Sequence, residues 1–551
     1  MRRFPHRLPH RLPHRLCATF AGAAFGLLYA TLASSHEADA PPARLGKVSF
    51  KVECNDAAQR EFNQAMAYYH SFAWGRLIEE PLERALKADP TCGMVHWLQA
   101  LAKLDNPFTW PGSLTAKVLA DGAAALDAAR AAGLKSARER DYVDALSAFY
   151  LDADKLNHRT RAKAMEAGFE KVAQRNPDDR EATILHALIL SANFDPTDKQ
   201  YTNQWRAAKL LEPIFKELPE HPGAAHYLIH SYDYPPIAQH GLEAARRYSK
   251  VAPDAPHAQH MPSHIFTRLG SWRDSVESNR ASAKADAAKG ANSMHAYDYM
   301  VYAYLQMNQD NAARQAMLEA MALPSKQDHI ASGYAYGAIP ARLALERGDW
   351  AQAANLELTP SATSGFPWKK YPQAEAVNAF ARGIGAAKGN DAAKAMVEVT
   401  RLQQLRDDAA ALKIAYWADQ IDIQVEVVTG LAALAQGRAE AGVEILRKAA
   451  AREDATEKHA VTPGPIVPAR ELLAGALLDQ GKAGEALAEY ERVLQREPNR
   501  LRPTLGALQA AEKAGDAAKA KAHAAKAVEL TGAADAPRPE VLHARQVASR
   551  G

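Results

Sequence analysis

Histidines concentrate in one stretch of this chain. Seven of the 20 histidines lie between residues 226 and 298. Two pairs, His226 with His230 and His260 with His264, are four residues apart, the spacing that places side chains on one face of a helix. Neutral imidazoles with a carboxylate suit zinc first and then, less selectively, iron, copper, nickel or manganese. We therefore expect a divalent-metal site with the ligands His226, His230, His257, His260, His264, His295 and Asp298.

The same stretch offers few candidates for catalysis. Asp233 and Tyr232 are the side chains that could move protons beside a bound ion. The stretch lacks the His-Glu-x-x-His arrangement, which would combine two zinc ligands with a general base. For any single histidine the alternative is a hydrogen-bonding or peptide-contacting role. Six together would repel one another if protonated, so a cation explains the cluster better.

Composition indicates that helices position these residues. The chain is rich in Ala, Leu, Glu, Lys and Arg and has no alternating strand pattern, which predicts an all-α fold. Near the C-terminus, Ala486 and Val493 recur 34 residues later as Ala520 and Ala527. That period, with a Gly turn between two helical segments, resembles the tetratricopeptide repeat (TPR), which implies an α-solenoid of antiparallel helix pairs. Similar units occur at 76–90, 164–177, 241–253, 270–283, 308–320, 348–357 and 437–450.

The repeat gives the histidines a register. If Gly270 and Asn308 are turns between paired helices, three consecutive first helices carry the cluster and direct it into the concave groove of the solenoid. Pro262 complicates the middle helix. It either kinks a helix that starts at Pro256 or begins a new one, in which case His260 precedes the first turn. We assign His70 to the first repeat, far along the solenoid from the cluster, with a structural role.

The first 40 residues read as a signal peptide. Five arginines precede an uncharged run from Cys17 to Ala33, and small residues allow cleavage after Ala33 or Ala40; an uncleaved anchor is the alternative. Without residues 1–40 the formal charge falls from +3 to about zero. We therefore expect an exported protein, periplasmic or secreted, with no nucleic-acid partner and no membrane insertion after cleavage.

Two cysteines remain in the mature chain. Cys54 and Cys92 stand at equivalent helix starts in successive repeats, which stacking brings together. In an oxidising compartment this pair predicts a disulfide across the N-terminal cap; two buried free thiols are the alternative.

The domain boundaries follow from these patterns. After the signal peptide (1–40) we expect an N-terminal arm (41–56), an N-terminal solenoid with the histidine cluster (57–358), a C-terminal solenoid (359–534) and a frayed tail (535–551). Gly- and Pro-rich stretches at 359–372 and 460–468 read as loops between repeats.

A more specific resemblance covers most of the first 300 residues. The matching segments are Cys54 with 67–72, 89–92 with His96 and Trp97, 138–146, 222–230, 257–264 and 270–279. They resemble a set of exported bacterial TPR proteins of undefined activity. Where that set carries His-x-x-His, this chain has His295-x-x-Asp298. The resemblance implies the fold and export and supplies no reaction.

Two functions follow from the sequence. The first is an exported scaffold that holds a protein or peptide in its groove and has a divalent-metal site there. The second is a metalloenzyme, hydrolase or oxidoreductase, built on the same solenoid.

Overall fold

The computed structural model describes residues 43–112, 114–324 and 327–550 of the chain. The expected signal peptide and its two cleavage positions lie outside these residues. The described part belongs to one compact unit, residues 43–551. None of its helices is both long enough and apolar enough to cross a membrane.

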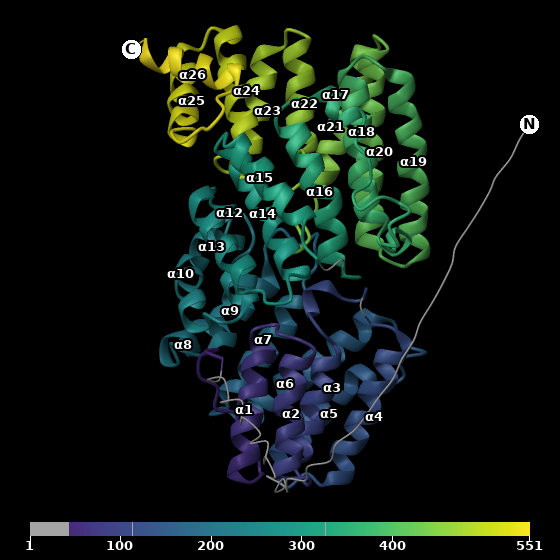
Figure 1. The fold of residues 1–551 in the computed structure, drawn as a ribbon, viewed down its shortest axis with the longest axis vertical. Coiled ribbons are helices and arrows are strands. Elements are labelled where there is room, and N and C mark those ends of the chain that lie inside the picture. Colours follow the sequence, from purple (N-terminus) through teal and green to yellow (C-terminus); the bar gives the residue numbers. More distant parts are fainter. Residues whose placement is uncertain (1–42, 113, 325–326, 551) are drawn as a thin grey trace, which may run out of the picture. The chain divides into compact units, whose positions relative to one another are not determined.

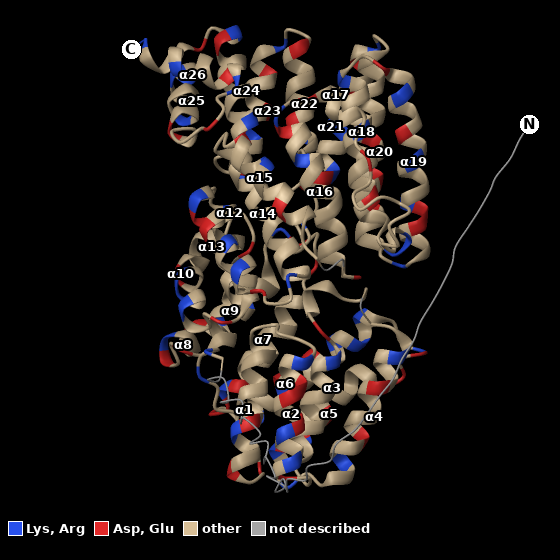
Figure 2. Ribbon diagram, viewed as in Figure 1, with Lys and Arg blue, Asp and Glu red and all other residues tan. Residues whose placement is uncertain are grey.

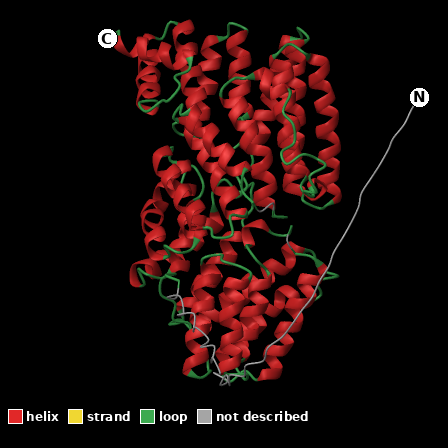
Figure 3. Cartoon of the chain, in the orientation of Figure 1, coloured by secondary structure: helices red, strands yellow, loops and turns green. Residues whose placement is uncertain are grey.

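Helices and loops make up the described residues, which contain no strand (Figure 3). The first half contains α1 (Asp56–His70), α2 (Arg76–Ala88), α3 (Gly93–Lys103), η1 (Pro107–Thr109), α4 (Ala116–Ala132), α5 (Ala137–Tyr150), α6 (His158–Arg175), α7 (Arg180–Ala192), α8 (Thr202–Glu217), α9 (Pro222–Tyr232), η2 (Ala238–Gly241), α10 (Leu242–Val251), α11 (Pro256–His260), α12 (Pro262–Arg268) and α13 (Trp272–Ala285). The second half contains α14 (Ala291–Gln306), α15 (Asp310–Met321), α16 (Ile330–Glu346), α17 (Trp350–Ala354), η3 (Trp368–Lys370), α18 (Pro372–Lys388), α19 (Ala392–Ala411), α20 (Ala415–Ala435), α21 (Ala439–Asp454), α22 (Ala469–Asp479), α23 (Ala483–Arg496), α24 (Leu501–Ala514), α25 (Ala517–Leu530) and α26 (Pro539–Ser549).

Neighbouring helices pack in pairs, and the pairs stack (Figure 1). Within pairs, α1 contacts α2, α5 contacts α6 and α18 contacts α19. Between pairs, the first helices contact one another, as α14 does α16 and α16 does α18. Alanines at these crossings are fully buried, because small side chains let two helices approach closely. The all-α solenoid of TPR-type helix pairs is therefore confirmed.

The turns inside the pairs lie where the sequence places them. Gly270 ends the segment before α13 with φ of 67°, and Asn308 separates α14 from α15 with φ of 52°. Such positive φ values favour Gly and Asn, which tolerate the left-handed region. The same geometry recurs at Gly348, Gly437, Gly481 and Gly515. These turns fix the register that brings the histidine helices side by side.

The N-terminal arm covers the end of the solenoid. Phe50 is fully buried and packs edge-on against Phe62 and Trp97, with ring centroids 5.4 and 5.6 Å apart. Cys54 and Cys92 form a disulfide with their Cα atoms 5.3 Å apart. Cys92 is the residue before α3, and Cys54 directly precedes the cap of α1, so the predicted cross-link between equivalent helix starts is confirmed.

The C-terminus differs from the expected frayed tail. Residues 539–549 form α26, which packs on α25 and buries Val541 and Ala544. Arg538 holds its start by an ion pair of 2.6 Å with Asp310. The sequence is polar enough to suggest fraying, but two buried apolar side chains and this ion pair suffice to hold the helix in place.

Lys, Arg, Asp and Glu lie interspersed along the helices (Figure 2).

Candidate metal centre

Three consecutive first helices carry the histidine cluster. His226 and His230 lie on α9, His260 on α11, His264 on α12 and His295 on α14. His257 is on α11 as well. Pro262 separates α11 from α12, yet Met261 between them keeps helical backbone angles (φ −53°, ψ −36°). The helix direction therefore continues through the break, and His260 and His264 still face each other.

The first triad consists of His226, His230 and His257. The Nε2 atom of His226 lies 3.1 Å from Nε2 of His230 and 3.1 Å from Nε2 of His257. His226 and His230 are buried and His257 is half-buried. The Nδ1 atom of His226 donates to the carbonyl oxygen of His70 at 2.7 Å, which leaves its Nε2 as a bare lone pair facing the other two rings.

The second triad consists of His260, His264 and His295. The Nε2 atoms of His260 and His264 lie 2.9 Å apart, and the rings of His260 and His295 have centroids 4.3 Å apart. One nitrogen from each of the three residues lies within 4.8 Å of the others. His295 is the half-buried member, and its Nδ1 is buried with no hydrogen-bond partner.

In two rings of this triad, the outer nitrogen, which faces away from the other rings, forms a hydrogen bond. That bond decides whether the inner nitrogen carries a proton. His264 Nδ1 donates to Asp233 at 2.8 Å. The Asn279 side-chain nitrogen donates to the Ser275 carbonyl, which turns the Asn279 side-chain oxygen toward His260. His260 Nδ1 donates to that oxygen at 2.5 Å. Both Nε2 atoms, 2.9 Å apart, are thus acceptors with no proton between them. Two facing lone pairs at this distance repel unless a cation lies between them.

The two triads are adjacent. The rings of His230 and His264 have centroids 6.1 Å apart, and those of His257 and His260 are 6.2 Å apart. Two imidazole nitrogens bound to one tetrahedral zinc ion at about 2.05 Å lie about 3.3 Å from each other. The observed separations of 2.9 and 3.1 Å are close to that value. The arrangement fits one ion in each triad.

Burial keeps these imidazoles neutral. Desolvation, and after it the neighbouring imidazoles, holds the pKa well below 6.5 for His226, His230, His257, His260 and His295. For His264 burial lowers the pKa and Asp233 partly opposes it. Neutral imidazole is the form that binds a metal, so the fold supplies the ligands in the required state.

Asp233 contacts one of these histidines and belongs to neither triad. It is buried and accepts from His264, from Arg268 Nε at 2.9 Å and from Lys458 Nζ at 3.1 Å. Burial alone would raise its pKa, but Lys458 and Arg268 hold the pKa of Asp233 well below 3.8. A carboxylate on the outer nitrogen of a histidine is the arrangement that orients metal ligands in many proteins.

Two other candidates lie apart from the triads. The Asp298 carboxylate pairs with Arg342 at 2.8 Å, with both side chains buried, and it does not join the converging nitrogens. The Tyr232 hydroxyl donates to Glu212 at 2.7 Å, which engages its proton away from the cluster. Helix register placed Asp298 one turn from His295, but a cation from α16 neutralises it instead.

His70 is closer to the cluster than the repeat spacing suggests. Its carbonyl oxygen accepts from His226, and its ring lies in a third group with Glu181 and His221. Glu181 binds both rings, at 3.0 and 2.9 Å. Burial alone would raise the pKa of Glu181, yet His221 and His70 lower it below its ordinary value. Because each ring nitrogen in this group already has a partner, we assign it a supporting role behind α9.

A loop between α21 and α22, residues 455–468, also reaches the site. Lys458 pairs with Asp233, and the Thr462 carbonyl accepts from Tyr299, whose ring lies 5.1 Å from that of His264. Burial, and next Arg268, lowers the pKa of Lys458 to about 8, so it remains protonated at neutral pH. The sequence marks this loop only by its Gly and Pro content and gives no sign that it contacts residues more than 200 positions earlier.

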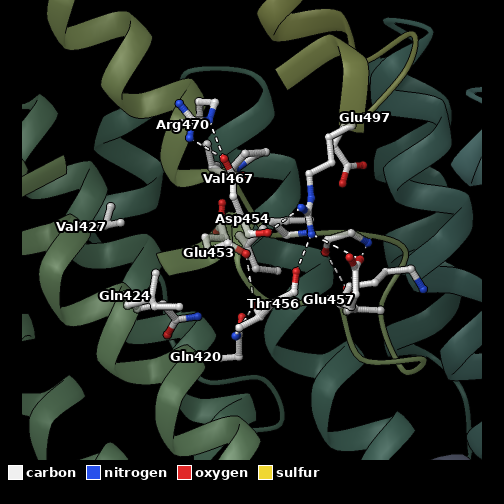
Figure 4. A pocket seen from close by; sticks show the side chains of 18 of the residues that line it. Gln420, Gln424, Val427, Glu453, Asp454, Thr456, Glu457, Val467, Arg470 and Glu497 are labelled. Atoms are coloured by element: carbon white, nitrogen blue, oxygen red, sulfur yellow. Dashed lines mark hydrogen bonds and ion pairs between the residues drawn. The ribbon is translucent and has the colours of Figure 1, made fainter. Parts of the chain in front are cut away.

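Ion pairs hold the loop from both sides. Glu457 binds Lys199 at 2.6 Å and Arg496 at 3.3 Å. Glu453, Glu457 and Glu497 line a small cavity of about 80 Å³ beside the loop. Figure 4 shows how these side chains lie around it. Burial, with Asp454 nearby, raises the pKa of Glu453 to about 7. These ion pairs therefore fix the position of the loop beside the histidine triads.

Comparisons with known proteins add little. No family model and no curated protein matches the chain. Among solved structures, it is similar to Naa15/Naa10 bound to HypK-THB, with 12% identity, a TM-score of 0.24 and coverage of 89% of this chain and 96% of that one. It is also similar to yeast Tom70, with 12% identity, a TM-score of 0.29 and coverage of 90% and 88%. At these values neither structure informs the function.

Proposed function

We propose that the protein binds two divalent metal ions, one in each histidine triad. The observation that carries this proposal is the facing pair of Nε2 atoms of His260 and His264, 2.9 Å apart, whose outer nitrogens already donate elsewhere. In the first triad only His226 has its outer nitrogen fixed by a hydrogen bond, and its bare Nε2 lies 3.1 Å from Nε2 of His230 and of His257. A bound cation converts this repulsion into coordination.

The ligand set indicates which ions would bind. Six neutral imidazoles without a carboxylate ligand suit zinc first, with copper and iron next, and suit manganese least. We propose zinc. We also propose that the protein is exported, because the disulfide in the described part agrees with the signal-peptide pattern of the first 40 residues.

A second candidate function is catalysis at this centre. Three protein ligands per ion leave a coordination position open for water or substrate, as in catalytic zinc sites, whereas structural zinc sites are filled by four. Zinc-bound water ionises near neutral pH and would supply a nucleophile for hydrolysis. Copper or iron in the same ligands would instead support an oxidoreductase. In either case, Asp233 would keep the His264 ring oriented.

The scaffold function is less supported at this point of the solenoid. The sequence predicts a protein or peptide ligand in the groove beside the histidine helices. The chain's own loop, residues 455–468, contacts Asp233 and Tyr299 there instead. A protein partner would therefore have to bind elsewhere along the repeats.

The test is elemental analysis of the mature protein, purified without an affinity tag. We expect about two equivalents of metal in the wild type and about one in His226→Ala/His230→Ala and in His260→Ala/His264→Ala. His240→Ala is the matched control, because His240 lies in the same stretch but is exposed and outside both triads. Absence of metal in the wild type, with none taken up from micromolar zinc or copper, would refute the proposal.

A further inference from the structure

A second cavity, of about 270 Å³, opens beside the first triad. His230 and Asp233 line it together with Lys458. Phe108 also lines it and stacks on the His230 ring, with centroids 3.9 Å apart and planes 14° apart. The cavity therefore borders the proposed metal centre, and a molecule inside it would lie next to a histidine ligand.

Aromatic side chains form much of the cavity wall. They are Phe108, Trp110, Phe194, Tyr234 and Tyr416. Phe194 and Tyr234 meet edge to face, with centroids 5.8 Å apart. Tyr416 is fixed by donating to the Glu457 carbonyl at 2.9 Å. Walls of this kind favour a flat ring, and a cavity of about 150 Å³ is already enough for benzene.

The charged side chains that line the cavity balance, with Arg159 and Lys458 against Asp233 and Glu457, so the proposed metal ions add a net positive charge beside it. Each carboxylate in its wall is paired with two cations: Asp233 with Arg268 and Lys458, and Glu457 with Lys199 and Arg496. The neutral imidazoles add no negative charge to offset metal ions. The Lys458 side chain is only 5% exposed, so water screens its charge weakly. This surplus favours an anionic group on the bound molecule.

From these contacts we propose that the cavity binds a small aromatic molecule that carries an anionic oxygen, a carboxylate or a phenolate. Its ring lies between the aromatic walls, and its oxygen faces Lys458 and the open coordination position at the first triad. The inference rests on the proposed metal function and adds the class of substrate to it.

The experiment measures binding and metal content separately. Benzoate, phenol and cyclohexanecarboxylate are titrated by calorimetry into mature protein that is either metal-free or loaded with zinc, and bound zinc is counted in each sample. Benzoate should bind both forms, and the zinc-loaded form more tightly. Cyclohexanecarboxylate, which has the charge without the flat ring, should bind about 3- to 10-fold more weakly than benzoate. Phenol is neutral in solution at neutral pH, so tighter binding of benzoate than of phenol shows that the anionic oxygen contributes to binding.

Two variants test the aromatic wall and the Lys458 charge separately. Phe194→Leu should weaken benzoate about 3- to 10-fold. Lys458→Met should weaken benzoate about 10-fold or more, since it removes a charge-assisted contact. Trp205→Leu is the control, because Trp205 is an exposed aromatic residue outside the cavity. Circular dichroism checks that each variant keeps its helices.

The outcomes are distinct for the two proposals. Zinc bound at two equivalents without benzoate or phenol binding overturns the cavity inference and leaves the metal function standing. Benzoate binding that equals cyclohexanecarboxylate binding, or that is unchanged in both Phe194→Leu and Lys458→Met, also overturns the inference. Benzoate binding to a protein that takes up no zinc supports the cavity and refutes the metal function.

Discussion

Each histidine of the two triads has two ring nitrogens, and the one facing away from the proposed ion decides what the other can do. Where that outer nitrogen donates to a fixed acceptor, the inner nitrogen is a lone pair pointing at its neighbours. The acceptors differ in kind: the His70 carbonyl, the Asp233 carboxylate and the Asn279 amide oxygen. None of these three contacts is recognisable from sequence, because each acceptor lies on a different helix or loop from the histidine that donates to it.

Asn279 allows a test of these hydrogen bonds to the outer nitrogens. Asn279→Ala removes the acceptor of His260 without changing any charge, so the ring loses its fixed tautomer and orientation. We expect zinc affinity of the second triad to fall about 10- to 100-fold while the first triad keeps its ion. Competition with a chelator of known affinity measures it.

The control for that variant lies on the same helix. Ser278 donates to the Gln259 carbonyl and, at 3.5 Å, to the His260 backbone carbonyl, and neither bond involves an imidazole nitrogen. Ser278→Ala should therefore keep both affinities. If Asn279→Ala binds zinc as tightly as Ser278→Ala does, the amide is only a packing residue.

Glu453 connects the loop to the pH dependence of stability. Its pKa in the folded protein is about 7, above the ordinary 4.5, mainly because it is buried. The folded state therefore holds the proton over this interval, and stability falls as pH rises from about 4.5 to 7. Glu453→Gln removes that loss and keeps an oxygen for the Ala469 amide, which donates to Glu453.

We expect Glu453→Gln to exceed the wild type in free energy of unfolding by roughly 1–2 kcal/mol at pH 8 and to match it near pH 4. Urea denaturation at the two pH values measures the difference. An equal difference at both values would show that the carboxyl does not titrate in this range.

Among the structural elements, the helices were the most predictable part. The 34-residue period and the turns at Gly270 and Asn308 located three successive first helices, and the structure places the histidines on them. Pro262 allowed two interpretations from sequence. The structure combines them, since α12 begins at Pro262 while α11 continues into it. Asp298 shows the limit: its position on α14 was predictable, but its pairing with Arg342 of α16 depends on packing between repeats.

The disulfide is the second element that the repeat could predict. It closes a separation of 38 residues and ties the starts of α1 and α3, where the solenoid lacks a preceding repeat. Cys54→Ser/Cys92→Ser should lower the free energy of unfolding by about 2–4 kcal/mol. Urea denaturation measures it, and wild type unfolded in reductant should give the same curve as the variant. Equal stability with and without reductant would mean that the thiols are not linked in solution.

At the scale of the whole molecule, the site depends on contacts between distant repeats. Lys458 pairs with Asp233, which is 225 residues earlier in the sequence. Lys199 pairs with Glu457, which is 258 residues later. A repeat pattern predicts how neighbours stack, but it contains no information about a loop that crosses several repeats. The sequence could therefore predict that these histidines lie on three neighbouring helices. It could predict neither the loop that contacts their surroundings nor the cavity that this loop helps to form.

This arrangement predicts that the loop controls access to the metal centre. Replacing residues 457–463 with a Gly/Ser segment of equal length removes the Lys458 side chain from Asp233 and the Thr462 hydroxyl from Arg342. All six histidines of the triads stay in place. Metal content should remain at two equivalents, because no ligand is lost. Transfer of zinc to excess EDTA should become about tenfold faster or more, since the site no longer has to open locally before the chelator enters. The control replaces residues 361–364, an exposed loop segment, and should exchange metal at the wild-type rate. If the loop variant exchanges no faster than this control, chelators reach the histidines by another route, and the 455–468 loop serves only to join the two halves of the solenoid.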